Sequence, residues 1–278
     1  MKKFSFLIAI FFLSGCAKTF VKKPATFSLR FTPGQTADYT MKIERTITIK
    51  EGDSIRNYIM KYNLGLSETV SEVSSEFITL NLNITRASGA VTHNGKPFAT
   101  EVFDRLKGHT ITIRLTPGGD VVDIRGIEKL PTLQGSNAEF VADYEVFSLL
   151  YDYQNPGTFK PLDIYKKETK IGSKVYRYEG IDRSKSAKGS AYITFKGSFD
   201  VKDAGYIGTY AYKSFTKGST SGYIYHLLDD GRPLEASEKF RLKDNYIFPG
   251  FSKLNKEIEV YTDVKVSQNI NIGGVGHE

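Results

Sequence analysis

The sequence contains very little cysteine and no tryptophan. One cysteine, Cys16, stands among 278 residues that include 17 tyrosines and 19 phenylalanines. A single thiol excludes a disulfide framework and a zinc site built on paired thiolates. The four histidines form no HExxH motif and no pair at ligand spacing, so we expect no metal ion. Because tyrosine and phenylalanine are common in strands, the aromatic content indicates a β-rich chain.

Sequence motifs for catalysis are missing as well. Segment 217–222 has glycines and serines but lacks the Gly-x-Ser-x-Gly spacing of a nucleophile elbow. Asp229 and Asp230 precede Gly231, a pattern typical of a turn rather than of paired catalytic carboxylates. No glycine-rich nucleotide loop follows a strand, and no basic stripe interleaved with aromatics suggests nucleic acid. We therefore expect no enzyme activity, no cofactor and no nucleic-acid partner.

Long hydrophobic runs are limited to the start of the chain. Residues 4–13 are apolar except for one serine, which is too short for a membrane span of about 20 residues. Lys2 and Lys3 precede this run, and together they have the layout of a signal peptide. The rest of the composition, 40% hydrophobic and 25% charged, is ordinary for a folded globular chain. Wholesale disorder and a polytopic membrane protein are therefore excluded.

The run ends in Leu13-Ser14-Gly15-Cys16, which resembles a bacterial lipobox. That resemblance implies removal of residues 1–15, lipidation of Cys16 and attachment to a membrane. Position 17 is Ala rather than the Asp that retains lipoproteins in the inner membrane, which favours the outer membrane, on its periplasmic or its surface face. The alternative is an ordinary secretory signal with a chance cysteine.

Alternating apolar and polar residues dominate the chain from residue 26. This period of two predicts half-buried strands, and the tight turns between them favour an antiparallel meander. A further strand is expected over 206–215. One face of the strands combines tyrosine with aliphatic residues, which suits an amphipathic ligand. The speculative ligand-binding residues are Tyr39, Met41, Ile43, Tyr58, Met60, Tyr62, Tyr210 and Tyr212. Tyrosine that merely fills a pleated surface is the alternative.

One substantial helix is expected over 136–153. Ser136 and Glu139 have the spacing of a capping box. Phe140, Tyr144 and Phe147 follow at helical spacing and are predicted to face the sheet, which leaves Glu145 on the outer side. His226 alternates with tyrosines of its strand and is predicted to point to solvent.

The chain is predicted to fold as one β-rich domain over 26–267. A tether (16–25) precedes it and a flexible tail (268–278) follows it. The hairpin patterns at 111–124 and 223–242 suggest a degenerate duplication around the helix, or two unrelated hairpins. The fold class is therefore all-β: a strongly curved antiparallel sheet or open half-barrel of about eleven strands with one central packed helix.

The order of lipobox, meander, hairpin, helix and second meander resembles a family of uncharacterised bacterial β-rich lipoproteins. Where that family has Val-x-Val-Gly-Asp-x-Trp, segment 169–175 keeps the glycine and lacks the Asp and the Trp. In architecture the chain is similar to the carriers LolA and LolB and the regulator RseB. The resemblance implies a curved sheet around helices whose concave face binds acyl chains or a protein, and it implies no catalytic residues.

The sequence thus predicts an outer-membrane-anchored, non-enzymatic lipoprotein. Its concave sheet face is expected to bind a hydrophobic ligand, such as an acyl chain, or an envelope protein. The alternative is a structural or assembly lipoprotein that docks on an envelope partner through edge strands.

Overall fold

The computed structural model describes residues 20–27, 30–99, 101–133, 135–151, 157–186, 189–228 and 231–269. Cys16, the expected signal peptide and residues 270–278 of the expected tail lie outside these residues. Gln268, assigned to the tail from the sequence, is still part of the last strand, and the backbone N–H of Asn269 donates to the carbonyl of Asp38 at 2.7 Å.

Strands make up most of the described chain, with one α-helix and three short 3₁₀ turns. In chain order the elements are β1 (Ala25–Phe27), β2 (Thr36–Glu51), β3 (Ser54–Val73), β4 (Ile78–His93), β5 (Lys96–Ala99), η1 (Asp104–Leu106), β6 (Thr110–Leu115), β7 (Val121–Arg125), η2 (Ile127–Lys129), α1 (Asn137–Ser148), β8 (Gly157–Phe159), β9 (Ile164–Thr169), β10 (Gly172–Asp182), β11 (Ser190–Ile207), β12 (Tyr210–Leu227), β13 (Pro233–Ile247), η3 (Ser252–Leu254) and β14 (Lys256–Gln268).

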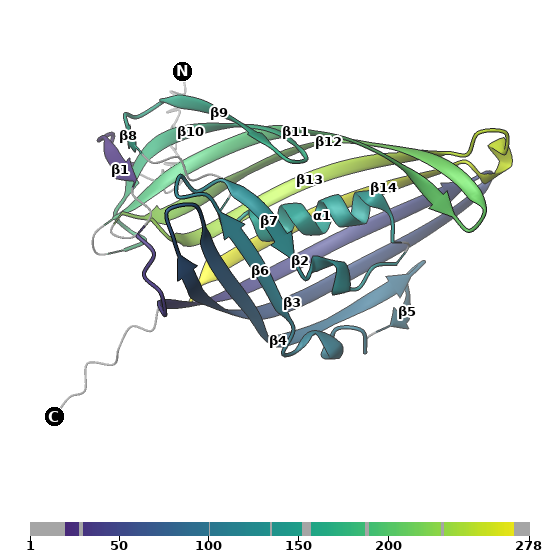
Figure 1. Cartoon of the computed structure of the whole chain (residues 1–278), viewed down its shortest axis with the longest axis horizontal. Helices are drawn as coiled ribbons and strands as arrows, with labels where there is room; N and C mark the ends of the chain where they lie inside the picture. Colours follow the sequence, from purple (N-terminus) through teal and green to yellow (C-terminus); the bar gives the residue numbers. More distant parts are fainter. Residues whose placement is uncertain are drawn as a thin grey trace, which may run out of the picture.

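One antiparallel sheet contains nearly all the strands. Eleven of them follow the order β7-β6-β4-β3-β2-β14-β13-β12-β11-β10-β9, and β5 pairs with β4 at the side. The sheet curves around α1 and is nearly closed, like a barrel (Figure 1). The predicted all-β fold with a curved sheet of about eleven strands and one central helix is therefore confirmed.

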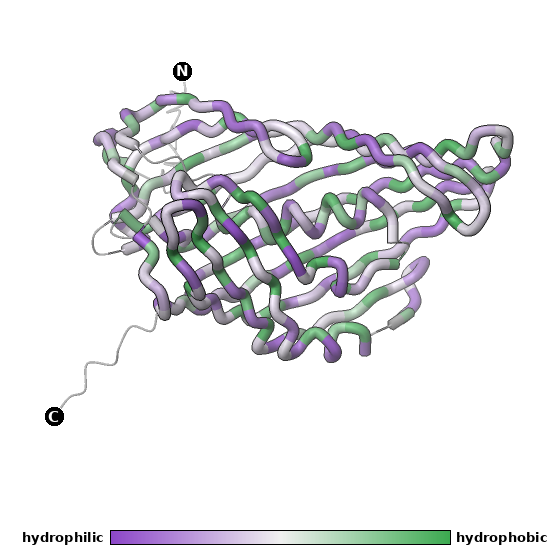
Figure 2. Tube along the Cα trace, viewed as in Figure 1, coloured by the Kyte–Doolittle hydropathy of each residue, from purple (hydrophilic) through white to green (hydrophobic). Residues whose placement is uncertain are grey.

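Side-chain alternation explains why these segments form strands. In β2 the apolar Met41 and Ile43 are buried, whereas Lys42 and Glu44 between them point outward. Along many strands hydrophilic and hydrophobic residues follow one another in turn (Figure 2). Because successive side chains point to opposite faces, one face of the sheet forms the core and the other faces water.

Two-residue turns join several of the long strands. Asn94 and Gly95 link β4 to β5 with positive φ angles of 49° and 78°, as a tight hairpin of the mirror-image type requires. The single strand expected over 206–215 is wrong, because Gly208 and Thr209 form a turn within it. β11 and β12 pair with each other on the two sides of this turn, with Ile207 opposite Tyr210. A two-residue turn reverses the phase of the alternation: Tyr206 pairs with Ala211, so it points to the opposite face from Tyr210 and Tyr212, although all three have even numbers.

Helix α1 begins at the predicted N-cap. The Ser136 hydroxyl accepts a hydrogen bond from the Glu139 N–H, and the Glu139 carboxylate accepts one from the Ser136 N–H, which completes the capping box. Regular helix ends at Ser148, earlier than the expected residue 153. The helix lies within the curve of the sheet, in contact with β12, β13, β14 and β7.

Two orientations predicted for this helix are wrong. Phe140 is 44% exposed, although it was expected to face the sheet, and Glu145 is fully buried, although it was expected on the outside. Tyr144 and Phe147 are buried as predicted. The reason is that α1 lies inside a sheet that curves around it, so nearly every side of the helix is covered and an apolar stripe does not mark the buried side.

The strand order joins the beginning and the end of the chain. β2 pairs with β14 along thirteen residue pairs, from Lys256 opposite Glu51 to Gln268 opposite Tyr39.

The end strands of the sheet are β7 and β9. Lys167 of β9 forms a 3.0 Å ion pair with Asp120, which lies just before β7. This contact links the two sides of the gap in the sheet.

Candidate functional site

The inner face of β2 and β3 holds six of the eight residues predicted to bind a ligand. Tyr39, Met41, Ile43, Tyr58, Met60 and Tyr62 are all buried in the core. The register places Ile43 opposite Tyr62, so the two strands bring their residues onto one surface. The other two residues are elsewhere: Tyr210 is exposed at the β11–β12 hairpin, and the Tyr212 hydroxyl donates to Asp203 at 3.0 Å.

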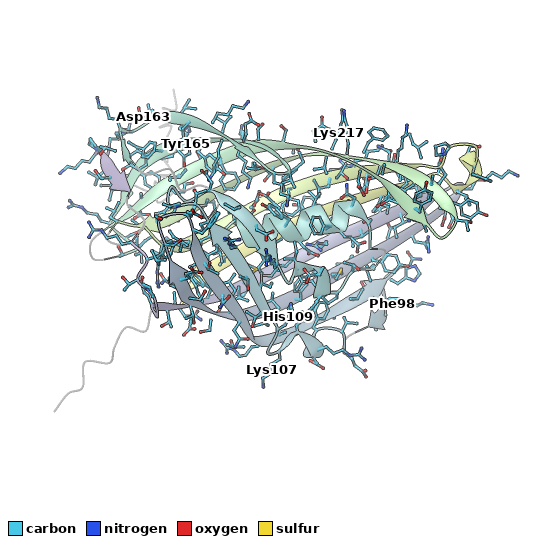
Figure 3. All side chains as sticks on the ribbon, in the orientation of Figure 1. Phe98, Lys107, His109, Asp163, Tyr165 and Lys217 are labelled. Carbon is cyan, nitrogen blue, oxygen red and sulfur yellow. The ribbon has the colours of Figure 1, made fainter. Side chains whose placement is uncertain are left out.

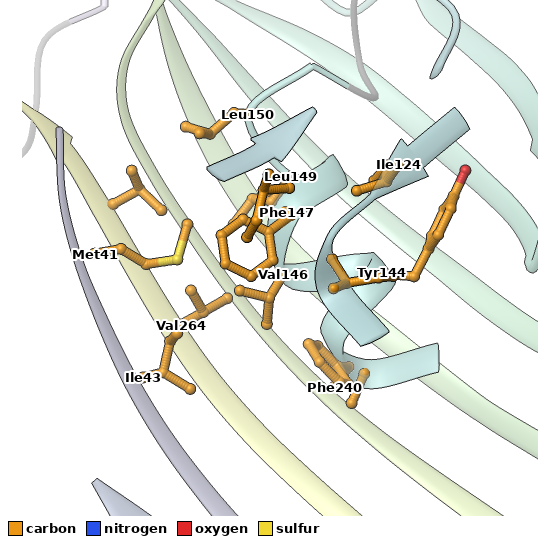
Figure 4. Packing of buried hydrophobic residues seen from close by; sticks show 14 of the residues in the cluster. Met41, Ile43, Ile124, Tyr144, Val146, Phe147, Leu149, Leu150, Phe240 and Val264 are labelled. Carbon is orange, nitrogen blue, oxygen red and sulfur yellow. The ribbon is translucent and has the colours of Figure 1, made fainter. Parts of the chain in front are cut away.

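Helix α1 packs on this inner face. Figure 4 shows Val146 and Phe147 of the helix beside Met41 and Ile43 of β2 and Val264 of β14. All five side chains are buried and belong to one hydrophobic cluster. The surface predicted to bind a ligand is therefore, in part, the surface on which the chain's own helix lies.

Charged side chains also reach into this interior. Arg45 of β2 forms a 2.8 Å ion pair from Nη1 to Asp143 Oδ1 of α1, and both side chains are almost completely buried. Arg45 Nε also donates to the Thr262 hydroxyl of β14 at 3.3 Å. Arg45 thus links Asp143, near the centre of the helix, to β2 and, through Thr262, to β14.

A second buried ion pair holds the helix two residues further along, at Glu145. Lys174 of β10 contacts the carboxylate of Glu145, and its ammonium lies 3.6 Å from Glu238 of β13. The hydroxyl of Thr220 in β12 donates to Glu238. One cation therefore faces two carboxylates from different elements, and all these side chains are buried.

The start of the helix is bound by polar groups of the sheet. Asp244 of β13 accepts a hydrogen bond from the Ala138 N–H at 3.2 Å and another from the Ser214 hydroxyl at 2.6 Å. The Asn137 N–H donates to the Tyr246 hydroxyl at 2.7 Å. A carboxylate near the first turn of a helix is stabilised by the free N–H groups there.

A third charged group lies near the end of the helix. The hydroxyl of Tyr151 donates to Glu68 of β3, and Arg232 lies 3.8 Å from the same carboxylate. Arg232 Nη1 also donates to the Thr36 carbonyl at 2.7 Å. The segment from Asn137 to Tyr151 is therefore held at its start, middle and end by charged or polar contacts with the sheet.

Burial changes the protonation of several groups. Burial raises the pKa of Asp143, and the charge of Arg45 opposes this rise. Burial also raises the pKa of Tyr62 to about 12.

His226 was predicted to point to solvent, but it is buried. Its Nδ1 lies 2.9 Å from the Gly231 carbonyl oxygen, and burial lowers its pKa to about 3. The correction follows from its strand, where both faces are covered: Tyr225, on the opposite side, is buried too.

These buried charges were missed from the sequence, although a signal existed. Arg45 shares the alternation of Ile43 and Ile47, and Glu68 shares that of Leu66 and Val70. A charged residue at a core position of a strand indicates a buried partner, because an unpaired buried charge is too costly.

The described residues contain no group of three or more His, Cys, Asp or Glu side chains placed to hold a metal ion. In the same part of the chain, no helix combines the length and apolar character needed to cross a membrane.

Comparisons with known proteins found only weak structural matches at low sequence identity. No family model matches the chain, and no curated protein does. Among solved structures, a lipovitellin structure described by its lipid–protein interactions is 10% identical with a TM-score of 0.49, covering 86% of this chain and 25% of that one. OccK7 (OpdD) of Pseudomonas aeruginosa is 7% identical over 85% of this chain and 99% of that one, with a TM-score of 0.23. The chain thus spans about a quarter of the length of the lipovitellin chain.

Proposed function

We propose that this protein is a non-enzymatic lipoprotein, anchored to the bacterial outer membrane, that binds a hydrophobic ligand on the inner face of its sheet. The observation that carries the proposal is the size of that face compared with its helix. Strand β3 has 20 residues and is about 68 Å long at 3.4 Å per residue. Helix α1 has 12 residues and is about 18 Å long. A helix of this length cannot by itself cover the apolar inner side of a strand nearly four times as long.

The seat of the helix supports the same proposal. Its contacts combine apolar packing with the ion pairs Arg45–Asp143 and Lys174–Glu145. Buried ion pairs contribute little net stability because desolvation offsets their attraction. An acyl chain that enters beside α1 would replace apolar contacts of the helix with its own. The ion pairs would then determine the position to which the helix goes back after the acyl chain leaves.

Binding of an apolar fluorescent probe to the purified protein tests the ligand proposal. We expect saturable binding, weakened by Met60→Phe, which enlarges a buried inner side chain. The matched control is Ile59→Phe on the same strand, whose side chain points outward and is 37% exposed. Overpacking costs about 1–3 kcal/mol, so melting curves must show that both variants stay folded. Equal binding by the two variants, or no saturable binding, contradicts the proposal.

Metabolic labelling with a radioactive fatty acid tests the anchor. Wild-type protein is expected to carry the label and fractionate with the outer membrane, whereas Cys16→Ser carries none, since Cys16 is the only thiol. Each buried CH₂ of an acyl chain contributes about 0.8 kcal/mol, so that a single acyl chain holds a protein on a membrane only weakly. Stable anchoring therefore needs more than one acyl chain. Label on the Cys16→Ser protein would rule out lipidation at this site.

Docking on an envelope partner through an edge strand is the second candidate. The observation that favours it is β9, which pairs only with β10 and carries Ile164, whose side chain is 66% exposed. Charged residues of the same strand, Lys166 and Glu168, protect such an edge from nonspecific pairing. Lipid extraction separates the two candidates: co-purifying acyl chains support ligand binding, and a protein without lipid favours docking.

A further inference from the structure

The side chain of Phe20, the first described residue, lies on the outer side of the sheet. The Phe20 ring stacks on Tyr192 of β11, with centroids 4.7 Å apart and planes 5° apart, and Tyr192 stacks in turn on Tyr225. Val21 exchanges backbone hydrogen bonds with Ile181 of 2.9 and 3.1 Å. Phe20 follows Cys16 by four positions in the sequence, and four residues of extended chain span at most about 14 Å. An anchor on Cys16 therefore holds this part of the outer surface close to the membrane.

From this aromatic contact, an excess of positive charge runs along β11 and β12. Four lysines point outward on the two strands, against one outward carboxylate, Asp200. These residues, which we name the basic strip, are Lys196, Lys202, Lys213 and Lys217. Lys217 lies 3.9 Å from Asp200, and both side chains are more than half exposed. Lys217 is labelled in Figure 3 on the outer side of the sheet, away from α1.

On the outer surface of β13, by contrast, the positive side chains are paired with carboxylates. These cations are bound to acids of β14: Lys239 to Asp263 at 3.2 Å, and Arg241 to Glu259 at 2.7 Å. The positive charge of β13 is thus neutralised within the sheet, whereas the four lysines of the basic strip share one outward carboxylate, Asp200, and keep a net positive charge. Charge complementarity indicates an anionic partner.

The basic strip ends at an exposed apolar tip. Tyr206 is 76% exposed, and Ile207, Tyr210 and Phe251 are also largely exposed. The Tyr210 and Phe251 rings meet edge to face at 5.0 Å, so the β11–β12 hairpin and the β13–β14 loop form one projection. This projection lies at the end of the molecule opposite β1 (Figure 1). Tyr192 and Tyr206 are fourteen residues apart on one strand, about 48 Å.

We propose that this outer surface lies on the anionic lipid surface of the membrane that holds the anchor, with the tip in the headgroup region. Tyrosine and phenylalanine beside aliphatic residues favour the boundary between headgroups and acyl chains. Lysines near an anionic bilayer are attracted to it. A projecting tip fits a bilayer, which has no fixed pocket. Three features on the outer side of the sheet, the Phe20 ring, the basic strip and Tyr206 of the tip, would then touch the membrane together. The proposal rests on the proposed function only for the position of the anchor.

Vesicle binding tests the charge requirement. The protein used is the full chain with Cys16→Ser, so that no lipid anchor contributes, and the vesicles are phosphatidylcholine with or without phosphatidylglycerol. We expect binding that depends on phosphatidylglycerol and falls as salt rises from about 0.05 to about 0.5 M. Replacing the four lysines of the basic strip with glutamine should weaken it about tenfold or more. The matched control carries the same number of changes on β2, β3 and β14: Lys42→Gln, Lys50→Gln, Lys61→Gln and Lys265→Gln.

Fluorescence tests the tip. The chain has no tryptophan, so Tyr206→Trp introduces a single reporter. Its emission should shift to the blue on phosphatidylglycerol vesicles, whereas Thr48→Trp, on the outer side of β2, should show no shift.

Each outcome decides the proposal. Equal losses for the two lysine sets, or an emission of the Tyr206→Trp protein that does not move, overturn it. Absence of vesicle binding also overturns it and would assign the basic strip to an acidic protein partner. Binding of the apolar probe to the sheet interior is measured without vesicles, so a failure here is distinguishable from a failure of the proposed function.

Discussion

At the scale of single residues, the ion pair between Arg45 and Asp143 contributes most directly to holding α1 in its position inside the sheet. Both side chains are buried, and their atoms lie 2.8 Å apart. Asp143→Asn leaves the Arg45 charge buried without its anion, which should lower the free energy of unfolding by about 3–5 kcal/mol. Urea denaturation followed by circular dichroism measures this change.

Two variants serve as controls for that measurement. Glu44→Gln removes the partner of Lys61 in an exposed ion pair of 2.9 Å and should cost less than about 1 kcal/mol. Replacing both buried partners with apolar residues, Arg45→Met with Asp143→Leu, should restore most of the stability lost in Asp143→Asn. A loss for Asp143→Asn no larger than that for Glu44→Gln would show that the buried pair does not hold the helix.

His226 makes stability depend on pH. Burial lowers its folded-state pKa from 6.5 to about 3. Between these values the unfolded chain binds a proton that the folded chain does not, so stability is full above pH 6.5 and falls as the pH decreases towards 3. The slope from this residue is at most about 1.4 kcal/mol per pH unit. Denaturation between pH 7 and pH 4 should show a shallower slope for His226→Gln; an unchanged slope would mean that His226 is not buried in its neutral form.

At the residue scale, alternation identified which side chains face inward but not what they meet there. Tyr39, Met41 and Met60 are buried on the inner face, in phase with the predicted pattern. The partner of Arg45 lies on the helix and that of Lys174 lies both on the helix and on β13, so these contacts depend on how the sheet curves. A pattern within one strand carries no information about that curvature. Whether the inner residues bind a ligand stays a prediction.

At the scale of the element, α1 offers a matched pair of aromatic side chains. Phe147 is 1% exposed and packs beside Met41, whereas Phe140 is 44% exposed on the same helix. Phe147→Ala should cost about 3–5 kcal/mol, as for other buried phenylalanines, and Phe140→Ala much less. Thermal melting of the two variants under one buffer condition measures the difference. Equal shifts of the melting temperature would contradict the position of the helix in the sheet.

The elements themselves were predictable where their signals are local. The capping box of Ser136 and Glu139 marked the start of α1, and strict alternation marked β2 and β3. The turn at Gly208 was missed because the tyrosines at 206, 210 and 212 keep one parity in the sequence, although the hairpin places Tyr206 on the opposite face from the other two. The buried side of α1 was misjudged at Glu145 because its covering strands come from both halves of the chain.

At the scale of the whole molecule, β14 is the strand that unites the sheet. It pairs with β2 on one side and β13 on the other, and so joins strands from the beginning of the chain to strands from its end. Its inward residues Ile258, Val260 and Val264 are completely buried. The sequence showed β14 as an alternating segment, but its two partners follow only from the topology. A duplication of the two halves stays a prediction.

A chain that stops before β14, after Asn255, should therefore fail to form the closed sheet. It would leave the hydrogen-bonding edges of β2 and β13 unpaired and uncover their apolar inner faces, a combination that promotes aggregation. We expect it to be insoluble, or to lack cooperative thermal unfolding and near-ultraviolet circular dichroism. The control chain stops after Asn269, keeps every described strand and should unfold cooperatively like the full chain. Cooperative unfolding of the shorter chain would show that the strands before β14 form a stable body on their own and that pairing of β2 with β14 is dispensable.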